Sequence, residues 1–110
     1  MPIALGEFEQ LVLFALLRLG PDAYGTTVRR EIQSRTGRQV SISAVYTTLE
    51  RLEQKGLVRS RTGEPTSERG GRRKRHFEVL PLGARALKAA YEAFTQMAHG
   101  LEHRIKGVPR

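Results

Sequence analysis

Basic side chains gather in one short segment of the chain, and this is the pattern that most directly suggests chemistry. Between Leu57 and His76, seven arginines and lysines occur against two glutamates, so the segment has a net charge of +5 in a 110-residue chain of formal charge +8. The seven are Arg59, Arg61, Arg69, Arg72, Arg73, Lys74 and Arg75. Arginine donates forked hydrogen bonds to phosphates and guanine edges, and Gly70 and Gly71 permit close approach of the backbone. We therefore expect an acidic polymer as the partner of this segment.

A charged loop that binds nothing specific is the simpler explanation of the same segment. No aromatic residue is interleaved among the cations from Arg69 to Arg75, which argues against a platform on which single-stranded bases stack. Contact with the phosphates of a duplex is the interpretation we favour.

A second set of polar side chains recurs at helical spacing between residues 41 and 55. One stripe of this segment is apolar and consists of Ile42, Val45, Leu49 and Leu52. The opposite face carries Ser43, Thr47, Arg51 and Gln54, with Tyr46 at its rim. Small hydroxyl groups near the start of a helix suit the reading of base edges in the major groove of DNA. A merely solvated face is the alternative, but this face lacks the Glu and Lys pairs of an ordinary exposed helix.

The third candidate motif would belong to an enzyme. His99, Glu102 and His103 have the spacing H-x-x-E-H, in which two histidines hold zinc and the glutamate acts as base. No later segment offers a third ligand, and a chain of this size has little room for a substrate cleft. Cysteine is absent, so thiolate catalysis, disulfides and cysteine zinc sites are excluded. We expect no catalytic residue, no metal and no cofactor.

Three short helices are predicted ahead of the basic segment. Apolar residues at helical spacing place the first over 7–19, with Gly20 and Pro21 ending it. Asp22 is expected to cap a second helix that ends at Gly37. Ser41 or Ser43 caps the third, after which Gly56 allows Leu57 to close back on Leu52.

A β-hairpin is predicted to follow, with strands over 57–61 and 74–80 and a polar tip over 62–73. Val58, Phe77 and Val79 are expected to face the core. Three helices followed by a basic hairpin is the layout of a winged helix-turn-helix, a mainly α fold of the α+β class. Residues 1–80 are therefore expected to form a DNA-binding domain.

The last helix is predicted to run over 81–107 from Pro81, with a tail over 108–110. Its apolar residues are spaced four, three, four, three and four apart, as in a coiled-coil seam. The first helix is apolar on a second side as well, through Leu13, Phe14 and Leu17. Both features predict a homodimer. The expected interface consists of Phe8, Phe14, Leu87, Tyr91, Phe94, Ala98, Leu101 and Ile105.

Nothing in the sequence suggests a membrane partner. The longest apolar run, Leu11 to Leu17, is far shorter than a bilayer span, and no basic region precedes it as in a signal peptide. We expect a cytoplasmic protein.

Three stretches resemble the PadR family of bacterial transcriptional regulators, namely LGEFEQLVLFALLRLGPDAYGTTVRREI, SAVYTTLERLEQKGLV and GEPTSERGGRRKRHFEVLPLGARAL. The resemblance implies a winged helix-turn-helix with a C-terminal dimerisation helix, usually a repressor that binds a pseudo-palindromic operator. The single short last helix is similar to the compact subfamily.

The resemblance also implies roles for individual residues. Tyr24 and Gly25 open the second helix, Ser43 and Tyr46 begin the DNA-reading helix, and residues 70–75 form the wing. The sequence departs from the family at Leu80, where Thr or Ser would cap the last helix. It also lacks the tryptophans between which some compact members bind flat aromatic drugs, so any small-molecule effector is left unassigned.

Double-stranded DNA is therefore the expected partner. The DNA-binding residues are predicted to be Tyr24, Ser43, Tyr46, Thr47, Arg51, Arg69, Gly70, Arg72, Arg73, Lys74 and Arg75. Two other functions fit the composition: a nucleic-acid binder without sequence preference, and an interaction module whose basic loop docks an acidic protein.

Overall fold

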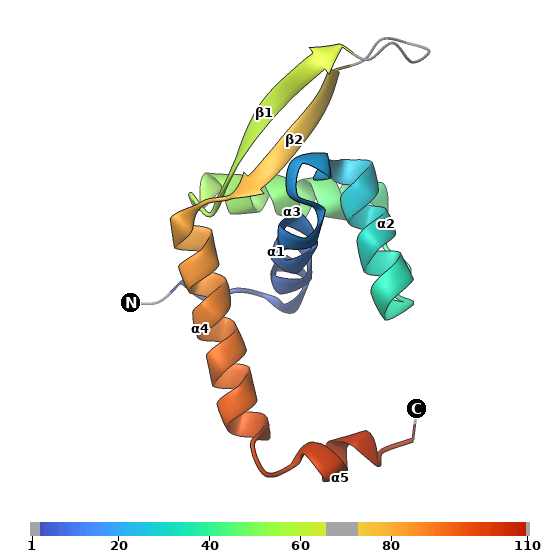
Figure 1. Cartoon of the computed structure of the whole chain (residues 1–110), viewed down its shortest axis with the longest axis vertical. Coiled ribbons are helices and arrows are strands. Elements are labelled where there is room, and N and C mark those ends of the chain that lie inside the picture. The colour runs from blue at the N-terminus through green and yellow to red at the C-terminus, as the bar shows by residue number, and fades with distance from the viewer. Residues whose placement is uncertain (1–2, 66–72, 110) are drawn as a thin grey trace.

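Three helices precede a β-hairpin and two helices follow it in the computed structural model, which describes residues 3–65 and 73–109 (Figure 1). The elements are α1 (Glu7–Leu19), the 3-10 turn η1 (Gly20–Asp22), α2 (Gly25–Thr36), α3 (Ile42–Gln54), β1 (Val58–Pro65), β2 (Arg73–Val79), α4 (Pro81–Ala98) and α5 (Glu102–Lys106). The predicted mainly α winged helix-turn-helix fold is confirmed.

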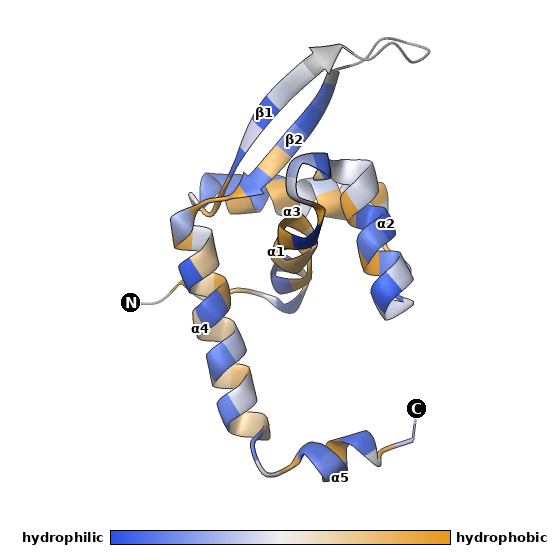
Figure 2. Ribbon diagram, in the orientation of Figure 1, coloured by the Kyte–Doolittle hydropathy of each residue, from blue (hydrophilic) through white to orange (hydrophobic). Residues whose placement is uncertain are grey.

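The core forms where α1, α2 and α3 pack together beneath the hairpin. Its members include Val12, Leu13 and Leu16 of α1, Val28 and Ile32 of α2, and Val45, Leu49 and Leu52 of α3. Figure 2 shows α1 as the most apolar helix, whereas the strands are mostly hydrophilic. Leu13, which the sequence placed on a second face of α1, is fully buried in this core, while Phe14 and Leu17 are exposed.

The start of α2 corrects one prediction. Asp22 does not cap the helix, because it ends η1, and the chain then extends through Ala23 and Tyr24. The backbone of this extension pairs with β2: the Phe77 amide donates to the Ala23 carbonyl at 2.9 Å, and Tyr24 bridges His76. This pairing delays the helix until Gly25. Its predicted end, Gly37, is confirmed with φ 70°.

Side-chain and backbone caps define α3. The Ser41 hydroxyl accepts a hydrogen bond from the Ala44 amide at 3.1 Å, so Ser41 rather than Ser43 is the cap. At the other end Gly56 has φ 76°, and the Leu57 amide donates to the Leu52 carbonyl at 3.0 Å. This is the predicted Schellman closure.

β1 and β2 form an antiparallel pair whose register runs from Val58 opposite Val79 to Thr62 opposite Arg75, with an irregularity before Pro65. The strands reach further into the predicted tip than expected. Val58 and Phe77 are buried as predicted, and Val79 is partly buried against the core.

The predicted continuous helix over 81–107 is wrong. Helix α4 begins at Pro81, without a side-chain cap from Leu80, and ends at Ala98. Gly100 then adopts φ 86°, and its amide donates to the Glu102 carboxylate at 2.9 and 3.0 Å. A left-handed residue held in this way interrupts the helical hydrogen bonds, so α5 is a separate short helix.

Gly83 shows how closely α4 packs against the hairpin. A Cβ atom at this position would come closer than 3.0 Å to the backbone carbonyl oxygen of Leu57. Backbone cannot swing aside as a side chain can, so the approach requires glycine.

We predict that Gly83→Ala lowers the free energy of unfolding by about 1–3 kcal/mol, the usual cost of overpacking. Ala84→Ser, which adds one atom at the exposed neighbouring position, should change it by less than about 0.5 kcal/mol. Urea unfolding followed by circular dichroism measures both. A Gly83→Ala protein that is more stable by about 1 kcal/mol, as helix propensity alone would give, contradicts the close packing.

Candidate nucleic-acid interface

The polar face predicted for α3 is open to solvent. Ser43, Thr47 and Arg51 are exposed, whereas Val45 and Leu49 on the other side are fully buried. Ile42, which was expected on the apolar stripe, is exposed because it is the first residue of the helix and precedes the contact with the core. The face therefore presents two hydroxyl groups and one guanidinium from a single rigid helix.

Tyr46 lies at the rim of this face, against the start of α2. A Cβ atom on Gly25 would approach the Tyr46 ring and hydroxyl closer than 3.0 Å, so the ring rests directly on the backbone of Gly25. Glycine at this position lets α2 and α3 approach each other. Tyr46 is 38% exposed, so part of the residue remains accessible to a partner.

Tyr24 joins the start of α2 to β2. The Lys74 ammonium donates to the Tyr24 hydroxyl at 3.1 Å and lies 4.5 Å from the centre of its ring. The ring also meets His76 edge-on, with 5.5 Å between ring centres. Tyr24 and Lys74, both predicted to bind DNA, are thus neighbours, and together they border the hairpin.

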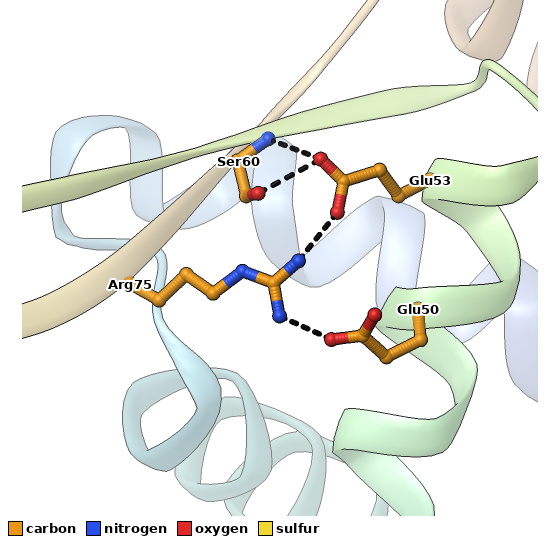
Figure 3. Close-up of polar contacts among 4 residues, drawn as sticks. All are labelled: Glu50, Glu53, Ser60 and Arg75. Atoms are coloured by element: carbon orange, nitrogen blue, oxygen red, sulfur yellow. Dashed lines mark hydrogen bonds and ion pairs between the residues drawn. The ribbon is translucent and has the colours of Figure 1, made fainter.

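Arg75 was also predicted to bind DNA, but its side chain is engaged by α3. Its guanidinium is held by two carboxylates of α3: it donates to Glu53 at 2.6 Å and forms an ion pair with Glu50 (Figure 3). The guanidinium also lies 4.9 Å from the centre of the Phe77 ring. Its charge is therefore compensated inside the protein, which makes Arg75 a link between hairpin and helix.

Ser60 on β1 completes this group. Its amide and hydroxyl donate to the second oxygen of Glu53, at 3.0 and 2.8 Å (Figure 3). Glu53 therefore binds both strands of the hairpin at once. We call Glu50, Glu53, Ser60 and Arg75 the hairpin clamp.

Hydrogen bonding sets the charge state of the clamp. The Ser60 hydroxyl, together with the Ser60 amide and the charge of Arg75, lowers the pKa of Glu53 despite an opposing effect of burial. Pairing with Glu50 and Glu53 raises the pKa of Arg75. Both groups are thus held in the charged forms that the clamp requires.

Sequence reasoning missed the acidic half of the clamp. Glu50 and Glu53 are three residues apart, so they share one side of α3. That spacing beside a basic strand is the signal that was available. The partner on the strand could not be chosen among several adjacent cations without the register of the hairpin.

Part of the predicted wing falls outside the described residues, namely Arg69, Gly70 and Arg72. Arg73 is the first residue of β2. Arg59 and Arg61 of β1 are exposed, and Arg59 pairs with Glu78 on the opposite strand.

The histidines of the H-x-x-E-H motif do not share a helix, since His99 follows the last residue of α4 and His103 belongs to α5. Within residues 3–65 and 73–109, no group of three or more His, Cys, Asp or Glu side chains is arranged to hold a metal ion.

The predicted dimer residues divide into two groups. Tyr91 and Phe94 of α4 are 57% and 71% exposed, and Phe14, Leu101 and Ile105 are also exposed. Leu87 is buried in the chain's own core, Phe8 packs partly against that core, and Ala98 is partly buried. Met97, which was not predicted, is 81% exposed on the same helix. No helix in the described part of the chain is long and apolar enough to cross a membrane.

Comparison with known proteins supports the winged helix-turn-helix fold described above. A family described as "Transcriptional regulator PadR-like family" matches residues 13–89. No curated protein gives a significant match.

Solved structures share the fold at low sequence identity. A PadR family transcription regulator from Clostridium difficile R20291 is 20% identical, with a TM-score of 0.73 over 93% of this chain and 100% of the other. A PadR-like transcriptional regulator from Bacillus cereus is 14% identical, with a TM-score of 0.72 over 92% and 93%. The complex structure of hsRosR-S4 is 23% identical, with a TM-score of 0.65 over 93% and 84%.

The clamp generates a prediction about acid stability. A carboxylate whose pKa is lowered by folding adds stability that is complete above its ordinary pKa of 4.5 and is lost as pH falls through the lower folded value. We expect Glu53→Gln to reduce the dependence of the free energy of unfolding on pH below about 5. Glu92→Gln, at an exposed position of α4, is the control. Urea titrations between pH 3 and pH 7 measure the effect, and identical pH slopes for wild type and Glu53→Gln would show that the clamp does not form.

Proposed function

The chain belongs to the PadR-like family of transcriptional regulators and is therefore a DNA-binding regulator, and we propose that it is a repressor that binds a pseudo-palindromic operator as a homodimer. The observation that carries the proposal is the exposed polar face of α3 beside a basic hairpin. Transcriptional regulators are generally not enzymes, and we assign no catalytic residue. The proposed place of action is the cytoplasm.

In this proposal α3 enters the major groove with its N-terminal end first. Ser43 and Thr47 lie nearest that end and contact base edges, while Arg51, one turn later, reads guanine or holds a phosphate. Tyr24, just before α2, and Tyr46, at the rim of the polar face of α3, contact the sugar-phosphate backbone. Exposure of the three polar side chains of α3 supports these roles.

The hairpin supplies phosphate contacts through Arg69, Arg72, Arg73 and Lys74, with Gly70 allowing close approach. Arg75 is assigned a different role, because its guanidinium is engaged by Glu50 and Glu53. We assign it to positioning the hairpin relative to α3. The number of phosphate contacts from the segment is therefore smaller than its charge suggests.

Dimerisation in this proposal uses the exposed apolar face of α4. Tyr91, Phe94 and Met97 leave a large apolar surface uncovered on a chain this small, and Phe14 of α1 is exposed as well. A second copy would bury these side chains and place two reading helices symmetrically. Residues 1–80 then form the DNA-binding unit, 81–107 the dimerisation unit and 108–110 a tail.

We predict that Thr47→Ala weakens binding to the operator by about 1–3 kcal/mol and weakens binding to random duplex much less. The reason is that a base contact is lost while phosphate contacts remain. Thr95→Ala on α4 is the matched control. Fluorescence anisotropy with both duplexes measures the ratio, and an equal loss on both would assign Thr47 to the phosphates.

We also predict that the double variant Phe94→Glu, Met97→Glu is a folded monomer. Both side chains are exposed in the single chain, so the charges should spare its core but oppose each other across the proposed interface. Light scattering should give a mass near 12.4 kDa for the variant and twice that for wild type and for the exposed control Lys88→Glu. A variant that stays dimeric removes α4 from the interface.

A further inference from the structure

A hollow of about 440 Å³ lies on the side of the hairpin away from the clamp. Its walls come from the end of α1, from η1 and from both strands, where the paired residues Arg59 with Glu78 and Arg61 with His76 contribute together with the core residues Phe77 and Val79. Figure 1 shows the turn after α1 beside the base of the hairpin, where these segments meet. The volume lies within the range of about 300–1,000 Å³ that is common for small-molecule sites. None of the residues assigned above to the reading face of α3 lines it.

One part of the lining is apolar. Leu16, Leu17, Pro21 and Phe77 contribute to it. Leu16 and Phe77 are almost fully buried in the core, so Pro21 and Leu17, which is 55% exposed, provide its accessible surface. An exposed leucine at the edge of a concave surface gains by being covered. This part of the hollow therefore suits a hydrocarbon or aromatic body.

The polar part of the lining has an excess of positive charge. Arg59 and Glu78 line the hollow and pair with each other. Arg61 lines it as well, and its guanidinium forms no hydrogen bond or ion pair with the residues that the structure describes. Among the residues that the structure describes, the charge left over at this site is thus that of Arg61, which suits a carboxylate or phosphate group.

His76 adds an unsatisfied polar group to the same lining. Its Nδ1 atom is buried and has no hydrogen-bond partner among the described residues. The ring is held edge-on against Tyr24. A buried nitrogen without a partner is costly, and because this atom is covered by the protein it is not itself a contact for a ligand in the hollow.

We propose that this hollow binds a small organic anion, whose apolar body covers Leu17 and Pro21 and whose acidic group pairs with Arg61. An apolar wall beside a cation that no described residue pairs with favours such a ligand over a DNA phosphate, which would make no contact with the apolar wall. The occupant would contact η1 and both strands, and so would connect the base of the hairpin to α1. The inference concerns binding to the protein alone and does not depend on the proposed operator or dimer.

Octanoate tests this proposal, because it combines a carboxylate with an apolar chain. Titration of ¹⁵N-labelled protein, followed by amide chemical shifts, should show saturable changes centred on Leu17, Arg61 and His76. Octan-1-ol, which lacks the charge, and acetate, which lacks the chain, should bind at least about tenfold more weakly, since a charged hydrogen bond or the apolar contact is lost. Arg61→Gln should weaken octanoate by a similar factor, and Arg85→Gln, at an exposed position of α4, should not.

Three results would overturn the proposal. The first is the absence of saturable shifts at the hollow, and the second is shifts centred on the exposed face of Tyr91, Phe94 and Met97. The third is equal affinity for octanoate in wild type and Arg61→Gln, with circular dichroism showing that the variant is folded. Each can occur whether or not the protein binds an operator, so the two proposals fail separately.

Discussion

Leu57 connects the end of α3, the hairpin and the start of α4. Its amide closes α3 by donating to Leu52, and its carbonyl accepts the Leu80 amide at 2.9 Å, while its side chain is fully buried. Gly83 then packs against that same carbonyl, at a distance that leaves no room for a Cβ atom. Because one peptide unit makes all these contacts, the directions of the hairpin and of α4 are both fixed relative to α3. In the proposed function, this relates the DNA-reading helix to the wing and to the dimer interface.

Further contacts hold the hairpin along its length. The clamp joins both strands to Glu53 of α3, and the pairing of Ala23 and Tyr24 with β2 joins the hairpin to the start of α2. Partly exposed ion pairs contribute little stability individually, so the clamp matters more for orientation than for total stability. It also uses positive charge internally, as does the Arg59–Glu78 pair. Net charge alone therefore overstates what the segment offers to DNA.

Much of the fold could be predicted because its signals are local. Apolar spacing gave α1 to the residue, glycines marked the ends of α2 and α3, and alternation located the hairpin. The errors arose where distant contacts or competing local hydrogen bonds determine where a helix begins or ends. Asp22 failed as a cap because the next two residues pair with β2, and the heptad spacing concealed the break that Gly100 makes. Leu87 belongs to the heptad pattern by spacing but is buried in the chain's own core. For the candidate site, the exposed face of α3 followed from amphipathicity, whereas the role of Arg75 depends on strand register, which sequence alone does not give.

The central claim is that two copies of α3, held in fixed relation by the proposed dimer, read DNA together. The most direct test of this claim is to select duplexes from a random library with the purified protein and to sequence those that are retained. We predict an enriched motif of two inverted half-sites, with centres about 10 base pairs or a multiple of that apart. Retained sequences with no common motif, or with one half-site alone, would contradict it.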